Sequence, residues 1–307
     1  MIYTVTLNPS IDYSLKVPGF EVGEVNRSVA EDYVPGGKGL NVSLMLKVLG
    51  VDSVSTGFVG GFVGQLITKS LDDRKIKHAF LGIGGNSRIN VKIEGREETA
   101  INASGPKVGQ AQLEELIRKL DGLVKDGDVV ALCGSFSPSL PDDAYAQILE
   151  SLRGKRILTV VDATKERLLD TLRYHPFLIK PNKAELEELV GEKAKDNDDV
   201  EKDARKLKAL GAQNVLVSLG GEGAILIDES EKARFLPASK GKVKSTVGAG
   251  DSMVAGFLTG FLKFSDFGKA LVLGLSAGSA KAFANGEPTK EEILCIARNT
   301  YGSDMSL

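Results

Sequence analysis

The feature that most constrains the fold is a regular alternation of helical and strand patterns from residue 110 onward. Four helical patterns each precede a strand pattern, in the pairs 110–125 and 129–132, 142–152 and 157–161, 165–173 and 177–179, and 199–210 and 215–217. Strands that alternate with helices form a mostly parallel sheet with helices on both faces. The alternation therefore predicts an α/β fold with a doubly wound sheet.

Two stretches depart from this alternation and look like half-exposed β-structure. Polar and apolar residues alternate at 12–17 and 27–30, before Pro35-Gly36-Gly37 breaks the pattern. They alternate again at 88–93 and 98–102, which a turn at 94–96 joins into a hairpin. We expect the two insertions, about 9–36 and 86–107, to form one small sheet that lies as a lid over the remaining α/β core of a single unit spanning 1–307.

Composition excludes several functional classes. The net charge of −2 and the absence of Trp argue against nucleic acid and against an anionic membrane surface as partners. The two cysteines, Cys133 and Cys295, are far apart, and the two histidines, His78 and His175, have no evident partners, so a zinc site or a Ser-His-Asp hydrolase is not expected. We expect free thiols, no membrane-spanning helix and no signal peptide, and hence a cytoplasmic protein.

The stretch Thr246-Val-Gly-Ala-Gly-Asp-Ser252 leads directly into a helical pattern. Gly248 and Gly250 allow a close approach of the backbone to a ligand, and a helix N-terminus attracts anions such as phosphate. Asp251 next to this loop could remove a proton from an attacking hydroxyl, which is the outline of a phosphoryl-transfer site. For the isolated pattern, a helix N-cap is the commoner role of such an aspartate.

Four further motifs carry polar groups at turns, and each has an ordinary structural interpretation as well. Residues 36–41 (GGKGLN) form a glycine-rich turn, although neither a Walker motif nor G-x-G-x-x-G occurs in the chain. Residues 8–12 (NPSID) place an aspartate where Asx turns are common. Residues 182–185 (NKAE) have the spacing of a capping box, and 218–224 (SLGGEGA) could be a hairpin turn between two strands, with Glu222 facing solvent.

Taken together and in this order, the motifs resemble the PfkB family of ribokinase-like sugar kinases. Ser245 stands where the broader family often has aspartate, and S-T-V-G-A-G-D is similar to the phosphofructokinase branch. The resemblance spans nearly the whole chain. It implies a ribokinase-like fold, ATP as co-substrate, Mg²⁺ as the metal and a sugar phosphate as the phosphoryl acceptor.

The resemblance also implies a role for each motif residue. Asp251 would be the catalytic base, and the backbone of Gly248, Ala249 and Gly250 the anion hole. The sugar phosphate would be bound by Asp12, Gly36, Gly37, Lys38, Asn41, Arg88 and Asn90. ATP would be bound by Lys183, Ser218, Gly220, Gly221, Gly223 and Gly250. Asn182 and Glu185 would position Mg²⁺ through its water ligands.

Within the family, the stretches 20–27 and 88–93 look most like kinases that phosphorylate fructose 1-phosphate at O6. Tagatose 6-phosphate and fructose 6-phosphate are the alternative acceptors, and a non-catalytic sugar-phosphate sensor is an alternative of another class. The lid is an open sheet with an apolar face and unpaired edges, which partners commonly cover. We therefore expect a homodimer formed through the lids, as is common in the family.

Overall fold

The computed structural model describes residues 1–163, 166–303, 305 and 307. Its larger sheet has ten strands in the order β14-β13-β12-β11-β10-β9-β1-β4-β5, with β6 paired to β4. All pairs from β11–β12 to β4–β5 are parallel, and only β12–β13 and β13–β14 are antiparallel. The predicted mostly parallel sheet is therefore confirmed.

The strands and helices have the following bounds. The strands of the larger sheet are β1 (Ile2–Thr6), β4 (Ser53–Gly60), β5 (Lys77–His78), β6 (Leu81–Ile83), β9 (Val129–Cys133), β10 (Leu158–Asp162), β11 (Leu178–Ile179), β12 (Asn214–Ser218), β13 (Ala224–Ile227) and β14 (Ala233–Leu236). The helices are α1 (Lys38–Val48), α2 (Gly61–Asp73), α3 (Gln110–Leu123), α4 (Ala144–Ser151), α5 (Glu166–Leu172), α6 (Lys183–Val190), α7 (Asn197–Ala209), α8 (Ala249–Phe264), α9 (Phe267–Phe283) and α10 (Lys290–Tyr301).

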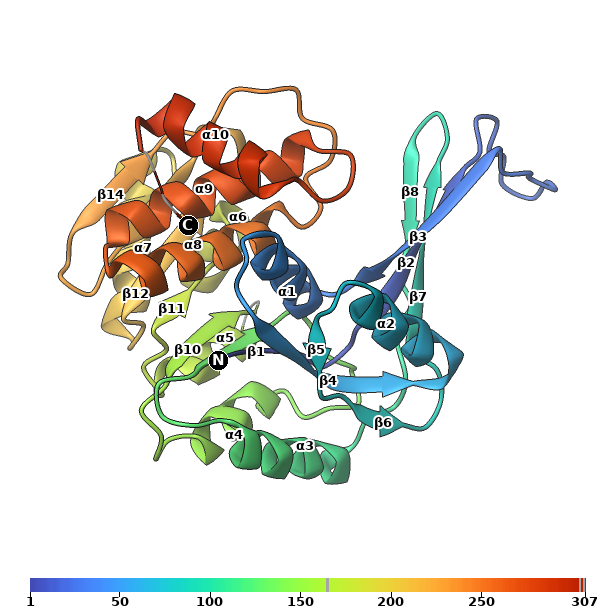
Figure 1. Cartoon of the computed structure of the whole chain (residues 1–307), viewed down its shortest axis with the longest axis horizontal. Coiled ribbons are helices and arrows are strands. Elements are labelled where there is room, and N and C mark those ends of the chain that lie inside the picture. The colour runs from blue at the N-terminus through green and yellow to red at the C-terminus, as the bar shows by residue number, and fades with distance from the viewer. Residues whose placement is uncertain (164–165, 304, 306) are drawn as a thin grey trace.

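Helices cover both faces of this sheet because successive residues of its buried strands point in opposite directions. In β9, Val130 and Leu132 join one apolar cluster with residues of α3 to α7. Val129, Ala131 and Cys133 of the same strand join a second cluster with α1, α8, α9 and α10. The result is the three-layer, doubly wound architecture that the alternation predicted (Figure 1).

A second sheet of four strands projects from the body of the molecule (Figure 1). Its order is β3-β2-β7-β8, and its strands are β2 (Ser10–Lys16), β3 (Ala30–Gly36), β7 (Arg88–Glu94) and β8 (Glu98–Ile101). The parallel pairing of β2 with β7 joins two segments that are far apart in sequence. The expected small sheet, built from two separate insertions, is thus present.

One strand of this sheet lies elsewhere than expected. The alternation at 27–30 suggested a strand there, with Pro35 ending it, but β3 begins at Ala30 and runs through Pro35 to Gly36. Antiparallel pairing with β2 sets this position, with Gly36 opposite Ser10. β3 is an edge strand, and a proline that donates no hydrogen bond is tolerated there.

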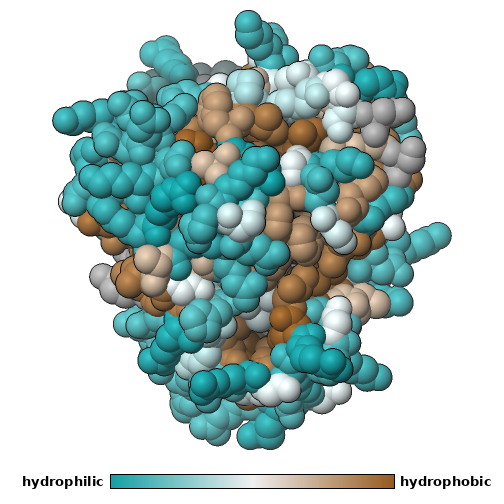
Figure 2. All heavy atoms as spheres, turned by 90° about the vertical axis from the view of Figure 1, so that its left-hand side faces the viewer, coloured by the Kyte–Doolittle hydropathy of each residue, from teal (hydrophilic) through white to brown (hydrophobic). Residues whose placement is uncertain are grey.

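The side of the molecule that lies away from the four-stranded sheet carries α7 and β14 (Figure 1). Hydrophilic side chains cover most of it, with a band of apolar residues between them (Figure 2). The charged run before and within α7 forms a solvated helix face, and Val200, Ala204 and Leu207 are buried beneath it. None of the described helices is both long and apolar enough to cross a bilayer.

Candidate active site

Two cavities adjoin at the carboxyl ends of the parallel strands, which is where open α/β sheets bind ligands. The larger cavity has a volume of about 510 Å³ and lies among β12, α8 and α9. The smaller one, of about 340 Å³, lies between the end of the central strands and the projecting sheet. Lys38, Glu185, Gly248 and Asp251 line both cavities. A ligand in each cavity would therefore meet its neighbour at these four residues.

Asp251 lies in the first turn of α8, but it does not cap the helix. The N-cap is Gly248, whose φ of 76° is in the left-handed region that favours glycine. The Asp251 carboxylate instead accepts a hydrogen bond, 2.8 Å long, from Nδ2 of Asn41, which belongs to α1. The helix-cap interpretation of this aspartate is therefore wrong, and its carboxylate is turned into the cavities.

The environment of Asp251 makes its carboxylate unusually basic. Its side chain is buried, with 6% of the residue exposed, and burial penalises the charged form. Burial first, and then the nearby negative charge of Asp162, raise the pKa of Asp251 to about 6. A carboxylate with a pKa near neutrality is ionised at pH 7 to 8 and still basic enough to accept a proton from a hydroxyl group.

A second buried acid, Asp162, lies beside Asp251 with two lysines. Lys38 Nζ donates to Asp162 Oδ1 at 2.8 Å, and Lys180 Nζ lies 3.7 Å from Asp162 Oδ2. Burial would raise the pKa of Asp162, but the two ammonium groups outweigh it and hold that pKa below its ordinary value. Burial likewise opposes the charge on Lys38, yet the surrounding carboxylates raise the pKa of Lys38 well above its ordinary value. Two acids and two cations are thus concentrated where the cavities meet.

The smaller cavity brings together the residues predicted to bind the sugar. Asp12 Oδ1 accepts hydrogen bonds from Ser10 Oγ at 2.9 Å and Asn90 Nδ2 at 2.9 Å, and Asp12 Oδ2 lies 3.2 Å from Lys92 Nζ. Arg88 Nε donates to the carbonyl of Asn8 at 2.9 Å, which fixes the guanidinium group at the cavity wall. The hydrogen bonds among Ser10, Asp12 and Asn90 therefore hold these polar groups in place at the cavity wall.

Glycines 36 and 37 have different roles in this region. A Cβ atom on Gly36 would lie 2.5 Å from Asp12 Oδ1, so Gly36 makes room for the Asp12 carboxylate without lining the cavity itself. Gly37 lines the cavity and has a φ of 126° immediately before α1. Lys38 and Asn41, on the first turn of α1, therefore point their side chains toward Asp162 and Asp251.

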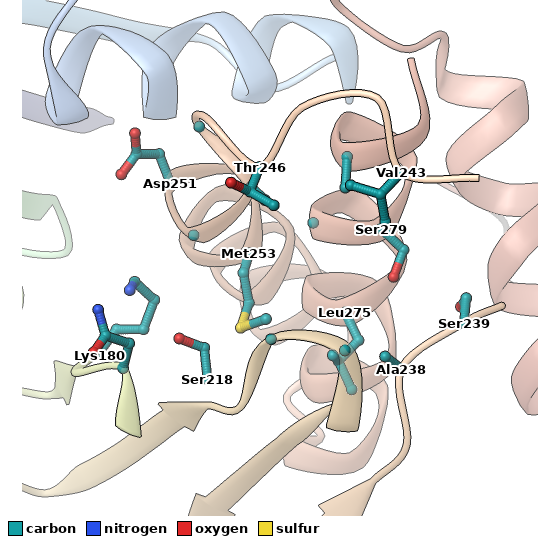
Figure 3. Close-up of a pocket in the computed structure, with 18 of the residues that line it drawn as sticks. Lys180, Ser218, Ala238, Ser239, Val243, Thr246, Asp251, Met253, Leu275 and Ser279 are labelled. Carbon is teal, nitrogen blue, oxygen red and sulfur yellow. The ribbon is translucent and has the colours of Figure 1, made fainter. Parts of the chain in front are cut away.

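The larger cavity contains most of the residues predicted to bind ATP. Ser218, Gly220 and Gly221 line it from the turn between β12 and β13, and Gly248, Ala249 and Gly250, which were predicted to form an anion hole, line it from the start of α8. In Figure 3, Asp251 and Lys180 lie at one end of this cavity, and Ala238 and Ser239 lie at the other. The remaining wall is largely apolar, with Met253, Val243, Leu275, Ala282 and Phe283.

Two of the residues predicted to bind ATP are not among the described residues that line the cavities. Lys183 is the first residue of α6 and is absent from both sets of lining residues. Gly223 has a φ of 121°, and a Cβ atom there would lie 2.0 Å from the carbonyl oxygen of Leu236, so backbone packing requires this glycine. Glu222 is exposed, as expected.

Asn182 and Glu185 form the capping box that their spacing predicted. Asn182 Oδ1 accepts from the Glu185 amide at 2.8 Å, and Glu185 Oε2 accepts from the Asn182 amide at 2.8 Å. The second carboxylate oxygen of Glu185 lies 4.0 Å from Lys38 Nζ, at the junction of the cavities. Capping the helix therefore leaves one carboxylate oxygen directed at the site.

Several residues that the structure places in the site belong to no sequence motif. Asp162 and Lys180 end or follow parallel strands, and Lys92 lies two residues beyond Asn90 on the same face of β7. The only sequence signal was their position at the carboxyl end of a predicted strand or on its inward face. Single charged residues at such positions are too common to stand out without the fold.

Comparison with known proteins agrees with this geometry. The model of the pfkB family carbohydrate kinases matches residues 5–291. A 1-phosphofructokinase of Bacillus subtilis is 42% identical over 291 residues, covering 95% of each chain, and a D-tagatose-1-phosphate kinase of Bacillus licheniformis is 37% identical, covering 93% of this chain and 94% of the relative. Phosphofructokinase-2 from Escherichia coli, solved in complex with fructose-6-phosphate, aligns with a TM-score of 0.90 and 26% identity over 98% of this chain and 99% of its own. The chain therefore belongs to the pfkB family of carbohydrate kinases, phosphotransferases that act on a sugar hydroxyl.

Proposed function

We propose that this kinase transfers the γ-phosphoryl group of ATP to O6 of fructose 1-phosphate. The observation that carries the proposal is the meeting of two cavities at a buried, basic carboxylate. ATP occupies the larger cavity, with its adenine against the apolar wall and its phosphates at the start of α8. The sugar phosphate occupies the smaller one, so that its free primary hydroxyl faces Asp251.

In the proposed reaction, Asp251 accepts the proton of the 6-hydroxyl as O6 attacks the γ-phosphorus. The new O6–P bond forms while the bond from the γ-phosphorus to the β,γ-bridging oxygen breaks, and ADP leaves. The amides of Gly248, Ala249 and Gly250 at the N-terminus of α8 hold the negative charge of the transferring group. Asn41 keeps the Asp251 carboxylate in place through the 2.8 Å hydrogen bond.

Mg²⁺ fits the donor groups at the junction of the cavities. Mg²⁺ keeps several water ligands and needs only one or two carboxylates together with substrate phosphates. Glu185 offers its second carboxylate oxygen there, and the Asn182 backbone amide fixes that side chain by donating to Glu185 Oε2. The ion would neutralise charge on the ATP phosphates, with Glu185 and Asn182 positioning it through its waters.

The proposed acceptor is a 1-phosphate because the relatives from Bacillus subtilis and Bacillus licheniformis are both kinases of ketohexose 1-phosphates. Lys38 and Arg88 supply the positive charge for that phosphate. Fructose and tagatose 1-phosphates differ only in the configuration at C4, so the choice between them depends on ring-hydroxyl contacts. Asp12, Asn41 and Asn90 present polar groups for those contacts.

The test is an ADP-release assay with ATP, Mg²⁺ and a panel of sugar phosphates. Fructose 1-phosphate is expected to give the highest kcat/KM, followed by tagatose phosphates, and ³¹P NMR should show the product phosphorylated at O6. Asp251→Asn is the control for activity that does not use this site. A higher kcat/KM for fructose 6-phosphate or tagatose 6-phosphate would overturn the substrate assignment but not the kinase assignment.

The four-stranded sheet is proposed to close over the sugar phosphate as a lid. Closure excludes water from the reacting groups and limits ATP hydrolysis without an acceptor. Asp12 and Arg88, which line the sugar cavity, belong to this sheet, so substrate contacts and lid position are linked. Amide hydrogen exchange in 86–107 should slow when sugar phosphate is added, and unchanged exchange would contradict closure.

The partner proposed for the outer side of the lid is a second copy of the chain. Tyr33 and Ile101 lie in one row across the sheet, together with Tyr13 and Val91, and are 54% and 58% exposed; β3 and β8 each leave one edge of the sheet unpaired. Together they form the type of open apolar sheet that an identical sheet can cover. Light scattering after size exclusion should give a dimer for the wild type and a monomer for Ile101→Glu. Leu210→Glu is the matched control, because Leu210 is equally exposed, at 59%, and lies at the end of α7, away from the four-stranded sheet.

A further inference from the structure

Thr6 is a buried polar residue of the sugar cavity to which neither a motif nor the reaction assigns a role. It ends β1, the strand between β9 and β4 at the centre of the parallel sheet. Only 2% of the residue is exposed, and it lines the smaller cavity together with Asp12, Asn90 and Asp251. The residue therefore reaches the wall of the cavity, and its hydroxyl oxygen is almost completely covered by protein.

The hydroxyl of Thr6 has no hydrogen-bond partner among the described residues. Thr4, two residues earlier on the same face of β1, shows the usual arrangement, because its hydroxyl pairs with Ser43 at 2.8 Å and Ser55 at 3.3 Å. A buried hydroxyl without a partner costs stability, and most buried polar atoms are paired. The exception at Thr6 therefore points to a partner that the protein itself does not supply.

Close packing of α1 fixes the Thr6 side chain in its orientation. A Cβ atom on Gly39 would lie 2.4 Å from Thr6 Oγ1, and one on Gly37 would lie 2.8 Å from Thr6 Cγ2. Glycines at both positions allow the start of α1 to pack against each branch of the threonine. A hydroxyl held this tightly can recognise a ligand group with little loss of conformational entropy.

Asn90 supplies a second partnerless atom in the same cavity. Its Nδ2 donates to Ser10 and Asp12, but its buried Oδ1 accepts nothing from the described residues. An amide oxygen only accepts, whereas a threonine hydroxyl both donates and accepts. A hydroxyl group can donate to Asn90 Oδ1 and can donate to or accept from Thr6 Oγ1, and a sugar ring carries several hydroxyl groups.

We propose that Thr6 is a specificity-determining residue, whose hydroxyl hydrogen-bonds a ring hydroxyl of the sugar phosphate. The inference rests on the proposed function, because it takes a ketohexose 1-phosphate as the occupant of this cavity. Loss of one partner from a buried pair leaves the other unsatisfied, so sites of this kind discriminate strongly against analogues that lack the hydroxyl. Thr6 thus adds a hydrogen-bonding group from the larger sheet to the sugar-binding groups that the lid contributes.

The test pairs Thr6→Val, which replaces the hydroxyl with a methyl group of similar size, with deoxy analogues of fructose 1-phosphate. Thr6→Val should lower kcat/KM for fructose 1-phosphate by roughly 5- to 100-fold, the effect of one unsatisfied buried partner. With either the 3-deoxy or the 4-deoxy analogue, whichever lacks the partner hydroxyl, wild type and Thr6→Val should differ by less than about 3-fold. Thr6→Ser, which keeps the hydroxyl, should retain most of the wild-type kcat/KM.

Thermal stability provides an independent readout, with Thr4→Val as the matched control. Thr4→Val breaks an existing hydrogen-bond network and should lower Tm, whereas Thr6→Val removes an unpaired hydroxyl and should leave Tm unchanged or higher. Wild-type kcat/KM in Thr6→Val, an equal loss with every analogue, or a fall in Tm as large as that of Thr4→Val would overturn the proposal. A wild-type enzyme inactive on every ketohexose 1-phosphate would instead refute the proposed function.

Discussion

Asp251→Asn should abolish most activity and at the same time make the protein more stable at neutral pH. Asparagine keeps an oxygen that accepts the hydrogen bond from Asn41, so the local packing is preserved. It has no charge to bury and cannot act as a base. Loss of general-base catalysis should lower kcat by roughly 10²- to 10⁴-fold.

The size of the stability gain follows from the pKa of Asp251. Burial and the charge of Asp162 raise that pKa from 3.8 to about 6. Each unit of pKa corresponds to about 1.4 kcal/mol, so the ionised carboxylate destabilises the fold by about 3 kcal/mol. The unfolded chain loses this proton near pH 4 and the folded protein near pH 6. The free energy of unfolding therefore falls between these two values as the pH rises.

The assay is urea unfolding of wild type and Asp251→Asn at several pH values from 4 to 8. The two proteins should have nearly equal stability at pH 4, and the variant should become more stable by up to about 3 kcal/mol above pH 6. Asp126→Asn is a control of opposite sign, because hydrogen bonds from Arg156 hold the pKa of the exposed Asp126 below its ordinary value. A difference between wild type and Asp251→Asn that is constant over this range would refute the reasoning.

Three further predictions follow from the same site. Lys38→Ala or Arg88→Ala should raise KM for all sugar phosphates together, whereas Asp12→Ala should compress the differences in kcat/KM among them; steady-state kinetics on the acceptor panel distinguishes the two patterns. Gly248→Ala forces a φ of 76° on a residue with a Cβ atom that would lie 3.3 Å from Lys281 Cε, so kcat should fall while sugar binding, measured by calorimetry, is retained. In Asp162→Asn, the acidic limb of the pH profile of kcat/KM should move to lower pH, and an unchanged limb would contradict the coupling of the two acids.

Sequence alone predicted the fold well because its main determinants are periodic. Helical and strand patterns alternate over about 110 residues, and few architectures accommodate that order. The small sheet was also predictable, since its strands alternate polar and apolar residues. The bounds of β3 were not, because pairing with β2 across the sheet places Pro35 opposite Ile11, and this tertiary contact overrides local signals.

The site was predictable only where residues are consecutive. The glycine loop before Asp251 and the GGKG turn are local motifs, and the capping box of Asn182 and Glu185 has a fixed spacing. Thr6 and Asp162 belong to no local motif of this kind. Thr6 is one of several threonines in buried strands, and its unpaired hydroxyl distinguishes it only once Thr4 is seen to be paired. Such residues become visible when the fold places strand ends side by side.

The placement of Asp162 explains why the site has two acids where the reaction uses one. Lys38 and Lys180 bring positive charge to the junction of the two cavities, and both lower the pKa of Asp251. With these cations alone, Asp251 would be a weaker base, because its ionised form would be stabilised. Burial raises the pKa of Asp251, and Asp162, which pairs with both lysines and repels Asp251, raises it further, so that the pKa is about 6 despite the two cations. The second acid therefore allows the same pocket to attract phosphate and to keep a base strong enough to accept the proton of a sugar hydroxyl.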